Sequence, residues 1–596
     1  MGEKMNLSYP FDSAELIKNK KKIKRELLND NTVRIKKNIA FLGGSTTNDI
    51  VNMTELFLLS NGIEPSFYQS EYAMYWQEAM FENKELKEFK PDIIFIHTTL
   101  RNIEELPAMN DSEQRVEEML EGAYKKFEAM WEHLKSEYGC TIIQNNFEYP
   151  FYRLLGNRDA WDIHGTVNFV NRLNDKFYAY ARSNNGFYIN DINYLSASMG
   201  LDNWCDLSFW YMYKYAMSMN GVVNLAFNLS NIIKSVFGKN KKTLVMDLDN
   251  TLWGGVVGDD GVENIEIGQE AADGQCFYDF QKYIKAHKQL GILLTVNSKN
   301  DEENALAGIS HPDGALNKDD FTVIKANWEN KDRNIIQTAA QLNLGADSFV
   351  FCDDNPVERD IVASSVEGIA VPKFDDPLNY IRTLDKNAYF EITAFSDDDL
   401  KRNEMYKANA QRQSLLYECA DFGEYLKGLE MTAVIEGFIP MYYQRISHLA
   451  NKSNQFNLTT KRYTVDEIQN VAEDKSYITL YGKLSDKFGD NGVVSLVIGR
   501  KDGKRLHIDL WLMSCRVLKR DMEFAMLDSL VQKCRENGIE EIIGYYYKTA
   551  KNSMVSELYK TFGFEKTEGF ENGDSEWKLN IENYENKNKV IKVELK

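Results

Sequence analysis

The sequence predicts a multidomain α/β protein made of three successive units. The chain has 596 residues, which at roughly 150 residues per domain means several domains. Apolar runs of strand length alternate with helix-like segments in the first two units, but follow one another in the third. We therefore expect two parallel sheets with helices on both faces, then an α+β unit with a mostly antiparallel sheet.

In the first unit (residues 1–238), helix-like segments such as Ser112–Glu137 separate expected strands at Asn38–Leu42, Asp92–His97, Thr141–Asn145 and Phe187–Asn190. In the second (239–390), strands are expected at Thr243–Asp247, Ile292–Val296, Phe349–Cys352 and Ile369–Val371. A helical connector (391–428) leads to the third unit (429–596). Its expected strands are Glu430–Gly437, Tyr477–Tyr481, Val493–Gly499, Leu506–Trp511 and Glu541–Tyr546, and its expected helices are Asp521–Asn537 and Lys551–Phe562.

Composition disfavours several classes of protein. The chain has 70 Lys and Arg against 90 Asp and Glu, a net charge of -20, which disfavours nucleic acid as the main partner because phosphate binding needs a basic field. It has no apolar run long enough for a membrane span and no apolar core for a secretory signal near its start. Seven scattered cysteines without a CxxC pair fit a reducing cytoplasm rather than a disulfide framework.

The strongest motif places two carboxylates at the end of a predicted strand. The apolar run Leu244-Val-Met ends in Asp247-Leu-Asp249, and parallel sheets bind ligands at the carboxyl ends of their strands. Carboxylates so close repel each other unless a cation lies between them. A site rich in oxygen ligands suits Mg²⁺.

Later segments supply the other parts of a phosphoryl-transfer site. Ser298 follows the second strand and can donate to a phosphoryl oxygen, Lys331 can neutralise charge, and Asp353 and Asp354 end the third strand. Lys299 and Lys325 are rival candidates for the cationic role. Thr251 and Asn297 are further candidates for substrate contact. The alternative is that these carboxylates only cap loops at strand ends.

The order of Asp, Ser, Lys and Asp-Asp resembles the haloacid dehalogenase (HAD) superfamily, with its Rossmann-like α/β domain. The resemblance implies that Asp247 accepts the phosphoryl group and Asp249 is the general acid and base. It also implies that Ser298 and Lys331 bind the phosphoryl group, and that Mg²⁺ is held by Asp247, the backbone of Asp249 and Asp353 or Asp354. The intervals on either side of Ser298 leave no room for a large cap, so an open site and a bulky substrate are expected.

Longer motifs resemble the FkbH-like family, HAD subfamily IIIC. They are Trp253-Gly-Gly-Val-Val-Gly-Asp-Asp-Gly, Asp353-Asp-Asn-Pro-Val-Glu-Arg, Asn451-Lys-Ser-Asn-Gln-Phe-Asn-Leu-Thr-Thr-Lys-Arg and Leu512-Met-Ser-Cys-Arg. This resemblance implies a phosphatase and glyceryltransferase. Such an enzyme takes a three-carbon acyl group from a donor like 1,3-bisphosphoglycerate, removes phosphate and loads an acyl carrier protein.

The third unit resembles the GNAT acyltransferase fold. Its turn before the long helix, Arg516-Val-Leu-Lys519-Arg520-Asp521, lacks the glycine of a pyrophosphate-binding loop, which disfavours coenzyme A. Cys515 lies in a basic segment that favours a thiolate, so it is either the acyl-carrying residue or a buried structural cysteine. Arg516 and Asn457 are candidates for acyl binding. The three cations after Cys515 could also form a docking patch for the carrier.

In the first unit, Gly43-Gly44-Ser45 resembles the nucleophile block of SGNH hydrolases, a flavodoxin-type α/β fold, with Gly44 in place of Asp. Asn102 matches the oxyanion position. The Asp-x-x-His block is not found, and Asp162-Ile-His164 has the wrong spacing. Without a histidine base Ser45 is a weak nucleophile, so a scaffold role is expected.

The sequence thus favours an Mg²⁺-dependent enzyme that dephosphorylates a small acyl donor and loads an acyl carrier protein. Two rivals remain open: a plain phosphatase with the third unit as a lid, and a scaffold that has lost catalysis. An N-acyltransferase using coenzyme A is a further option.

Overall fold

The computed structural model describes residues 6–30, 32–393, 395, 400–419, 421–549 and 551–594. The chain forms two compact units. The first is mainly Phe11–Lys239. The second is mainly Asn240–Tyr463 with Ile468–Lys596, so it contains most of the predicted second and third units. Positions 394, 396–399 and 420 of the predicted connector lie outside the described residues. None of the described helices combines the length and apolar character needed to cross a membrane.

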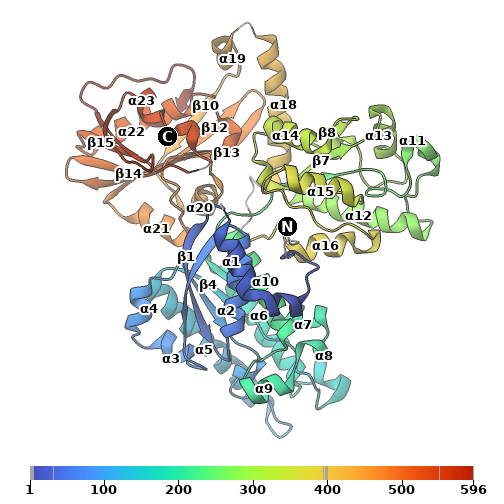
Figure 1. The fold of residues 1–596 in the computed structure, drawn as a ribbon. Helices are drawn as coiled ribbons and strands as arrows, with labels where there is room; N and C mark the ends of the chain where they lie inside the picture. Colours follow the sequence, from blue (N-terminus) through green and yellow to red (C-terminus); the bar gives the residue numbers. More distant parts are fainter. Residues whose placement is uncertain are drawn as a thin grey trace. The chain divides into compact units, whose positions relative to one another are not determined.

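The first unit, coloured blue to green in Figure 1, is built on a parallel sheet. Its strand order is β2-β1-β3-β4-β5. Its strands are β1 Ile35–Gly43, β2 Ile63–Gln69, β3 Ile93–His97, β4 Thr141–Asn145 and β5 Phe187–Asn190. Its helices are α1 Ser13–Asn29, α2 Asn48–Ser60, α3 Tyr75–Met80, α4 Lys84–Phe89, α5 Glu113–Tyr138, α6 Thr166–Ser183, α7 Ile192–Met199, α8 Leu201–Trp204, α9 Leu207–Tyr213 and α10 Met219–Val236.

Helices cover both faces of this sheet, as expected. Along β1, Ile39 and Phe41 join a core with α2 and α10, whereas Ala40 and Leu42 join a core with α5 and α6. This alternation follows from the two-residue repeat of a strand. The sequence did not reveal β2, an edge strand that contains Pro65, because proline is tolerated at edges but weakens the strand signal.

The second unit contains a parallel sheet in the order β8-β7-β6-β9. Its strands are β6 Thr243–Met246, β7 Leu293–Ser298, β8 Val323–Ala326 and β9 Phe349–Cys352. The helices around it are α11 Val257–Asp260, α12 Ala272–Gln289, α13 Glu302–Ile309, α14 Lys331–Leu342, α15 Pro356–Ser365 and α16 Tyr380–Asn387. The expected strand at Ile369–Val371 is wrong: in the described chain Ala370 makes only one bridge, with Val350.

A mixed sheet completes the second unit, in the order β16-β17-β15-β14-β13-β12-β10-β18, with β11 beside β14. Its strands are β10 Thr432–Glu436, β11 Phe456–Asn457, β12 Tyr477–Asp486, β13 Gly489–Asp502, β14 Arg505–Met513, β15 Glu541–Tyr546, β16 Glu565–Gly569, β17 Ser575–Asn580 and β18 Lys592–Glu594. The helices are α18 Arg402–Glu418, α19 Phe422–Gly428, α20 Tyr443–Lys452, α21 Val465–Glu473, α22 Met522–Glu536 and α23 Leu558–Thr561.

In this sheet β14 and β15 are parallel and pair only over Arg505–His507 and Glu541–Ile543. Beyond that point the chain after β11 lies between them. Leu458 donates its N–H to the Trp511 carbonyl at 3.0 Å and accepts from the Tyr547 N–H at 2.9 Å. The mostly antiparallel α+β arrangement is as expected, but a segment distant in sequence bridges the two parallel strands.

Trp131 of α5 anchors the aromatic core of the first unit. Its ring centroid lies 4.7, 4.6 and 4.7 Å from those of Phe177, Tyr180 and Phe187. We expect Trp131→Ala to lower the free energy of unfolding by about 3–5 kcal/mol, as measured by denaturant titration with far-UV circular dichroism. Trp161, which is 67% exposed, is the matched control, and Trp161→Ala should cost about 0.5 kcal/mol or less. Equal losses would contradict this view of the core.

Candidate functional site

The carboxyl ends of β6, β7 and β9 meet at one edge of the parallel sheet. Strand β6 is central, and its Met246 pairs with Val296 on one side and Cys352 on the other. This register places Asp247 directly after β6, Ser298 at the end of β7 and Asp353 directly after β9. Parallel pairing therefore brings together Asp247 and Asp353, which are more than a hundred positions apart in the sequence.

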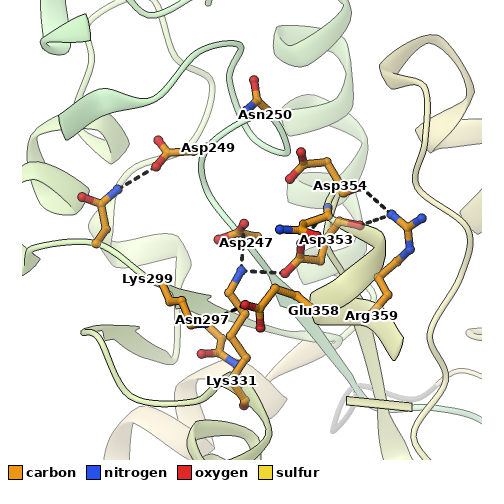
Figure 2. Close-up of polar contacts among 12 residues, drawn as sticks. Asp247, Asp249, Asn250, Asn297, Lys299, Lys331, Asp353, Asp354, Glu358 and Arg359 are labelled. Carbon is orange, nitrogen blue, oxygen red and sulfur yellow. Dashed lines mark hydrogen bonds and ion pairs between the residues drawn. The ribbon is translucent and has the colours of Figure 1, made fainter. Parts of the chain in front are cut away.

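Lys331 lies between two of these carboxylates (Figure 2). Its Nζ is 2.9 Å from Oδ2 of Asp247 and 2.6 Å from Oδ2 of Asp353. All three residues are buried. Burial alone would lower the pKa of Lys331, but the two carboxylates outweigh it and raise that pKa. Burial, with the charge of Asp247, raises the pKa of Asp353 to about 6. The ammonium is therefore what permits the carboxylates to lie together.

Asp247, Asp353 and Asp354 form a group suited to a divalent cation. One oxygen from each lies within 4.8 Å of the others. Asp247 Oδ1 is buried and has no hydrogen-bond partner among the described residues, which is costly for a carboxylate oxygen unless a ligand satisfies it. An oxygen-only donor set fits Mg²⁺.

Asp249 is held apart from this group (Figure 2). Its Oδ1 accepts from Trp253 Nε1 and from the Val257 N–H, both at 2.9 Å, and its Oδ2 accepts from Asn300 Nδ2 at 2.9 Å. Both carboxylate oxygens of Asp249 are therefore engaged away from Asp247, which leaves only its backbone for the metal contact that the resemblance implies. Burial raises the pKa of Asp249, which favours a carboxyl group that can carry a proton.

The geometry separates the three candidate lysines. Lys299 Nζ pairs with Glu358 Oε1 at 2.6 Å, and Lys325 Nζ donates to Gln337 Oε1 at 3.4 Å. Neither ion pair nor hydrogen bond joins them to Asp247 in the described structure. Lys331 is also the first residue of α14, so the positive end of the helix dipole adds to its charge at the site.

Asn297 and Thr251, expected to touch substrate, are internal. Asn297 is 1% exposed; its Nδ2 donates to the Lys331 carbonyl at 2.9 Å and its Oδ1 accepts from Asn334 Nδ2 at 3.1 Å. It therefore positions the start of α14. Thr251 is fully buried in the turn after β6. Ser298 is buried at the end of β7, where it was expected.

Arg359 is a positioning residue whose role the sequence did not reveal. Its Nη1 donates to the carbonyls of Asp353 and Asp354, both at 2.7 Å, and to that of Phe374 at 3.1 Å. Its Nη2 pairs with Asp375. These bonds fix the turn that carries the two carboxylates. The motif around Asp353 contains Arg359, but an arginine that binds backbone carbonyls has no characteristic spacing in the sequence that would reveal its role.

Cys515 lies at the other end of α14 from Lys331. Asn343, the residue after that helix, donates Nδ2 to the Cys515 carbonyl at 2.6 Å. The half-buried side chain of Cys515 packs against a core that includes Val245 and Tyr406. Since α14 has 12 residues, about 18 Å of helix separates the two positions. Asp247, which contacts Lys331, and Cys515 therefore lie near opposite ends of α14.

The cations after Cys515 do not form one surface patch. Arg520 is 6% exposed, and its guanidinium shares Asp486 with Arg412. Arg516 donates to Met405 Sδ, and Lys519 is the only one of the three that is exposed. The expected patch is therefore wrong for Arg520, because Asp486 draws it inward. Asn457 is also fully buried: its side chain accepts from the Thr460 N–H at 2.8 Å and donates to the Ser453 carbonyl at 3.2 Å.

Asp486 is the shared anion of a buried cluster. Arg412 binds it through two hydrogen bonds of 2.8 and 2.7 Å, and Arg520 through one of 3.2 Å. We expect Asp486→Asn to lower the free energy of unfolding by about 3–5 kcal/mol, because it leaves two buried guanidiniums without a counter-charge. Asp490→Asn is the control, since Asp490 is 54% exposed and 3.9 Å from Lys483. Similar denaturation midpoints for both variants would contradict this.

A solved structure matches this chain over most of its length. The N-terminal part of the protein BF1531 from Bacteroides fragilis, which contains a phosphatase domain and is complexed with Mg, is 28% identical to this chain. The match covers 63% of this chain and 99% of that one, with a TM-score of 0.58.

Smaller matches include the ribosomal-protein-S18-alanine N-acetyltransferase from Escherichia coli, 12% identical over 26% of this chain and 99% of that one, TM-score 0.21. Another is Ard1 from Thermoplasma volcanium, 18% identical over 25% of this chain and 95% of that one, TM-score 0.20. No protein family description and no curated protein matches the chain. Over most of its length, this chain is therefore similar in structure to a protein with a phosphatase domain.

Proposed function

We propose that the chain is an Mg²⁺-dependent phosphatase of the HAD type, with Asp247 as nucleophile. The observation that carries the proposal is the buried Lys331 between Asp247 and Asp353, beside a carboxylate oxygen of Asp247 that no described residue satisfies. The similarity to a phosphatase-containing protein complexed with Mg supports it.

In this proposal a carboxylate oxygen of Asp247 attacks phosphorus, and the bond from phosphorus to the substrate oxygen breaks. Asp249 gives its proton to the leaving oxygen, then takes one from the water that hydrolyses the aspartyl phosphate. For this step, the side chain of Asp249 must first rotate away from its hydrogen bonds with Trp253 and Asn300 and toward Asp247. Lys331, Ser298 and the start of α14 hold the phosphoryl oxygens. Mg²⁺, when bound by Asp247, Asp353 and Asp354, neutralises phosphoryl charge.

The finer proposal concerns the substrate. Between β6 and α12 the chain forms only α11 and a short 3₁₀ turn, which supports an open site for a group carried on a protein. We propose a three-carbon acyl phosphate as donor and an acyl carrier protein as acceptor, in the cytoplasm, where the seven free cysteines of this chain stay reduced.

Acyl transfer and dephosphorylation would take place at separate positions. The Cys515 thiolate attacks the acyl carbon, a carbon–sulfur bond forms, and the acyl phosphate leaves as inorganic phosphate. The carrier thiol then displaces Cys515, and Asp247 removes the second phosphate. The separation along α14 requires the carrier arm to move between the two positions.

A plain phosphatase is the second candidate, and the placement of Cys515 favours it. The Cys515 side chain packs against the core and lies far from Asp247. In that case the GNAT-like part would not transfer an acyl group.

Phosphate release from p-nitrophenyl phosphate tests the phosphatase. We expect none from Asp247→Asn, and a loss of about 10²-fold or more from Lys331→Ala, because one preorganised charge is removed at the reacting centre. Lys299→Ala is the matched control and should keep the rate within a few-fold. Chelation of Mg²⁺ should abolish the activity, and added Mg²⁺ should restore it. Full activity of Asp247→Asn would sink the proposal.

Intact mass spectrometry tests the acyl transfer. The full chain is incubated with 1,3-bisphosphoglycerate, Mg²⁺ and a phosphopantetheinylated carrier. We expect the carrier to gain a phosphate-free three-carbon acyl group. Cys515→Ala should abolish this gain while leaving p-nitrophenyl phosphate hydrolysis intact, and Cys276→Ala should change neither. Phosphate release without a carrier adduct would leave only the plain phosphatase.

A further inference from the structure

A row of buried side chains crosses the carboxyl edge of the sheet in the first unit. Ser45 Oγ is 3.0 Å from His97 Nε2, and His97 Nδ1 is 2.9 Å from Asn145 Nδ2. Asn145 Oδ1 in turn accepts from Asn190 Nδ2 at 2.8 Å, and Asn190 Oδ1 accepts from Asn228 Nδ2 at 2.8 Å. Serine, histidine and a third polar group in contact form the outline of a serine hydrolase.

No histidine partner for Ser45 is recognisable in the sequence, but the structure places His97 beside it. His97 ends β3, Ser45 follows β1 and Asn145 ends β4. These strands are neighbours in the sheet, so their ends converge. A lone histidine at the end of an apolar run gives no sequence signal that separates it from a core residue.

The carbonyl of Thr98 sets the direction of the hydrogen bonds along this row, which we call its polarity. Asn145 Nδ2 donates to this carbonyl at 3.2 Å, and a carbonyl oxygen can only accept. Turning the amide over would place Asn145 Oδ1 against it. The nitrogen of the Asn145 amide therefore faces Thr98 and His97, and its oxygen faces Asn190, whose nitrogen donates to it.

A donor facing His97 Nδ1 fixes the tautomer of the ring. Nδ1 must present its lone pair to the Asn145 N–H, so in the neutral ring the hydrogen is on Nε2. Nε2 then donates to Ser45 Oγ and has no lone pair to take the serine proton. Burial lowers the pKa of His97 to about 4, so the ring stays neutral at ordinary pH. A general base needs the opposite tautomer, and an amide in place of a carboxylate selects the wrong one.

The expected oxyanion group is also engaged. Asn102 Nδ2 donates to the Gly44 carbonyl at 3.0 Å, and its Oδ1 accepts from the Thr99 N–H at 3.0 Å. A Cβ on Gly44 would lie 2.4 Å from Asn102 Nδ2, so the aspartate of the nucleophile block cannot be accommodated without moving Asn102. Asn102 thus ties the Ser45 loop to the turn after β3.

We propose that Ser45, His97 and Asn145 form a serine hydrolase-like row with reversed proton polarity, in which His97 donates to Ser45 and cannot activate it. Asn145 is the positioning residue that fixes this polarity. The row joins the ends of neighbouring strands by hydrogen bonds, and Ser45 is not a hydrolase nucleophile.

Nitrogen NMR of the full chain, labelled with ¹⁵N-histidine, tests the proposal directly. His97→Gln assigns the signals of His97. We expect the Nε2–H tautomer in the unmodified protein and no labelling of Ser45 by a fluorophosphonate. An Nδ1–H tautomer, or fluorophosphonate attached to Ser45, would overturn the proposal.

Asn145→Asp tests the role of the amide. A carboxylate only accepts, so we expect His97 to switch to the Nδ1–H tautomer. Asn171→Asp is the control, because it adds the same charge at an exposed position of α6 and should leave the tautomer unchanged. If His97 kept the Nε2–H tautomer in a folded Asn145→Asp protein, Asn145 would not set the polarity and the proposal would fail.

Discussion

The ammonium of Lys331 is the constraint on which the candidate site depends. Three strand ends converge, and two of them deliver buried carboxylates that would repel each other without a cation. Neighbouring residues hold Lys331 and the carboxylates in position. Asn297 holds the backbone of Lys331, and Arg359 holds the carbonyls of the turn that bears Asp353. The oxygen of Asp247 without a partner remains for a ligand.

Each of the two compact units gathers polar residues at the carboxyl edge of its parallel sheet, but the two sets of residues have opposite chemical properties. In one, the strand ends gather three carboxylates and a lysine, a group of charges that suits a divalent metal ion. In the other, they gather amides, a neutral imidazole and a hydroxyl, which satisfy one another. The fold class alone therefore says little about chemistry; the charge and hydrogen-bond direction of the residues at the strand ends decide it.

The sequence predicted the structure correctly where an apolar strand is followed directly by a functional carboxylate. The strand before Asp247 and the one before Asp353 were predicted within a residue or two, and so was the approach of their carboxylates. Edge strands β2 and β8 were not, because Pro65 and Lys325 interrupt their apolar patterns. Asn297 and Asn457 were expected to touch substrate, and the structure shows that each donates to a backbone carbonyl. An asparagine that binds backbone and one that binds ligand look alike in sequence. The tautomer of His97 depends on the Thr98 carbonyl, which no residue pattern encodes.

The buried cluster of Arg412, Asp486 and Arg520 has a consequence for inheritance. Arg412 belongs to α18, in the segment expected to be a mere connector, whereas Asp486 ends β12 of the mixed sheet. A recombination event that exchanged only the residues after Gly428 would join an arginine from one parent to a sheet from another. Unless both parents kept the same charges, the hybrid would bury an unmatched ion. The helix and the sheet are therefore expected to pass between genomes as one piece.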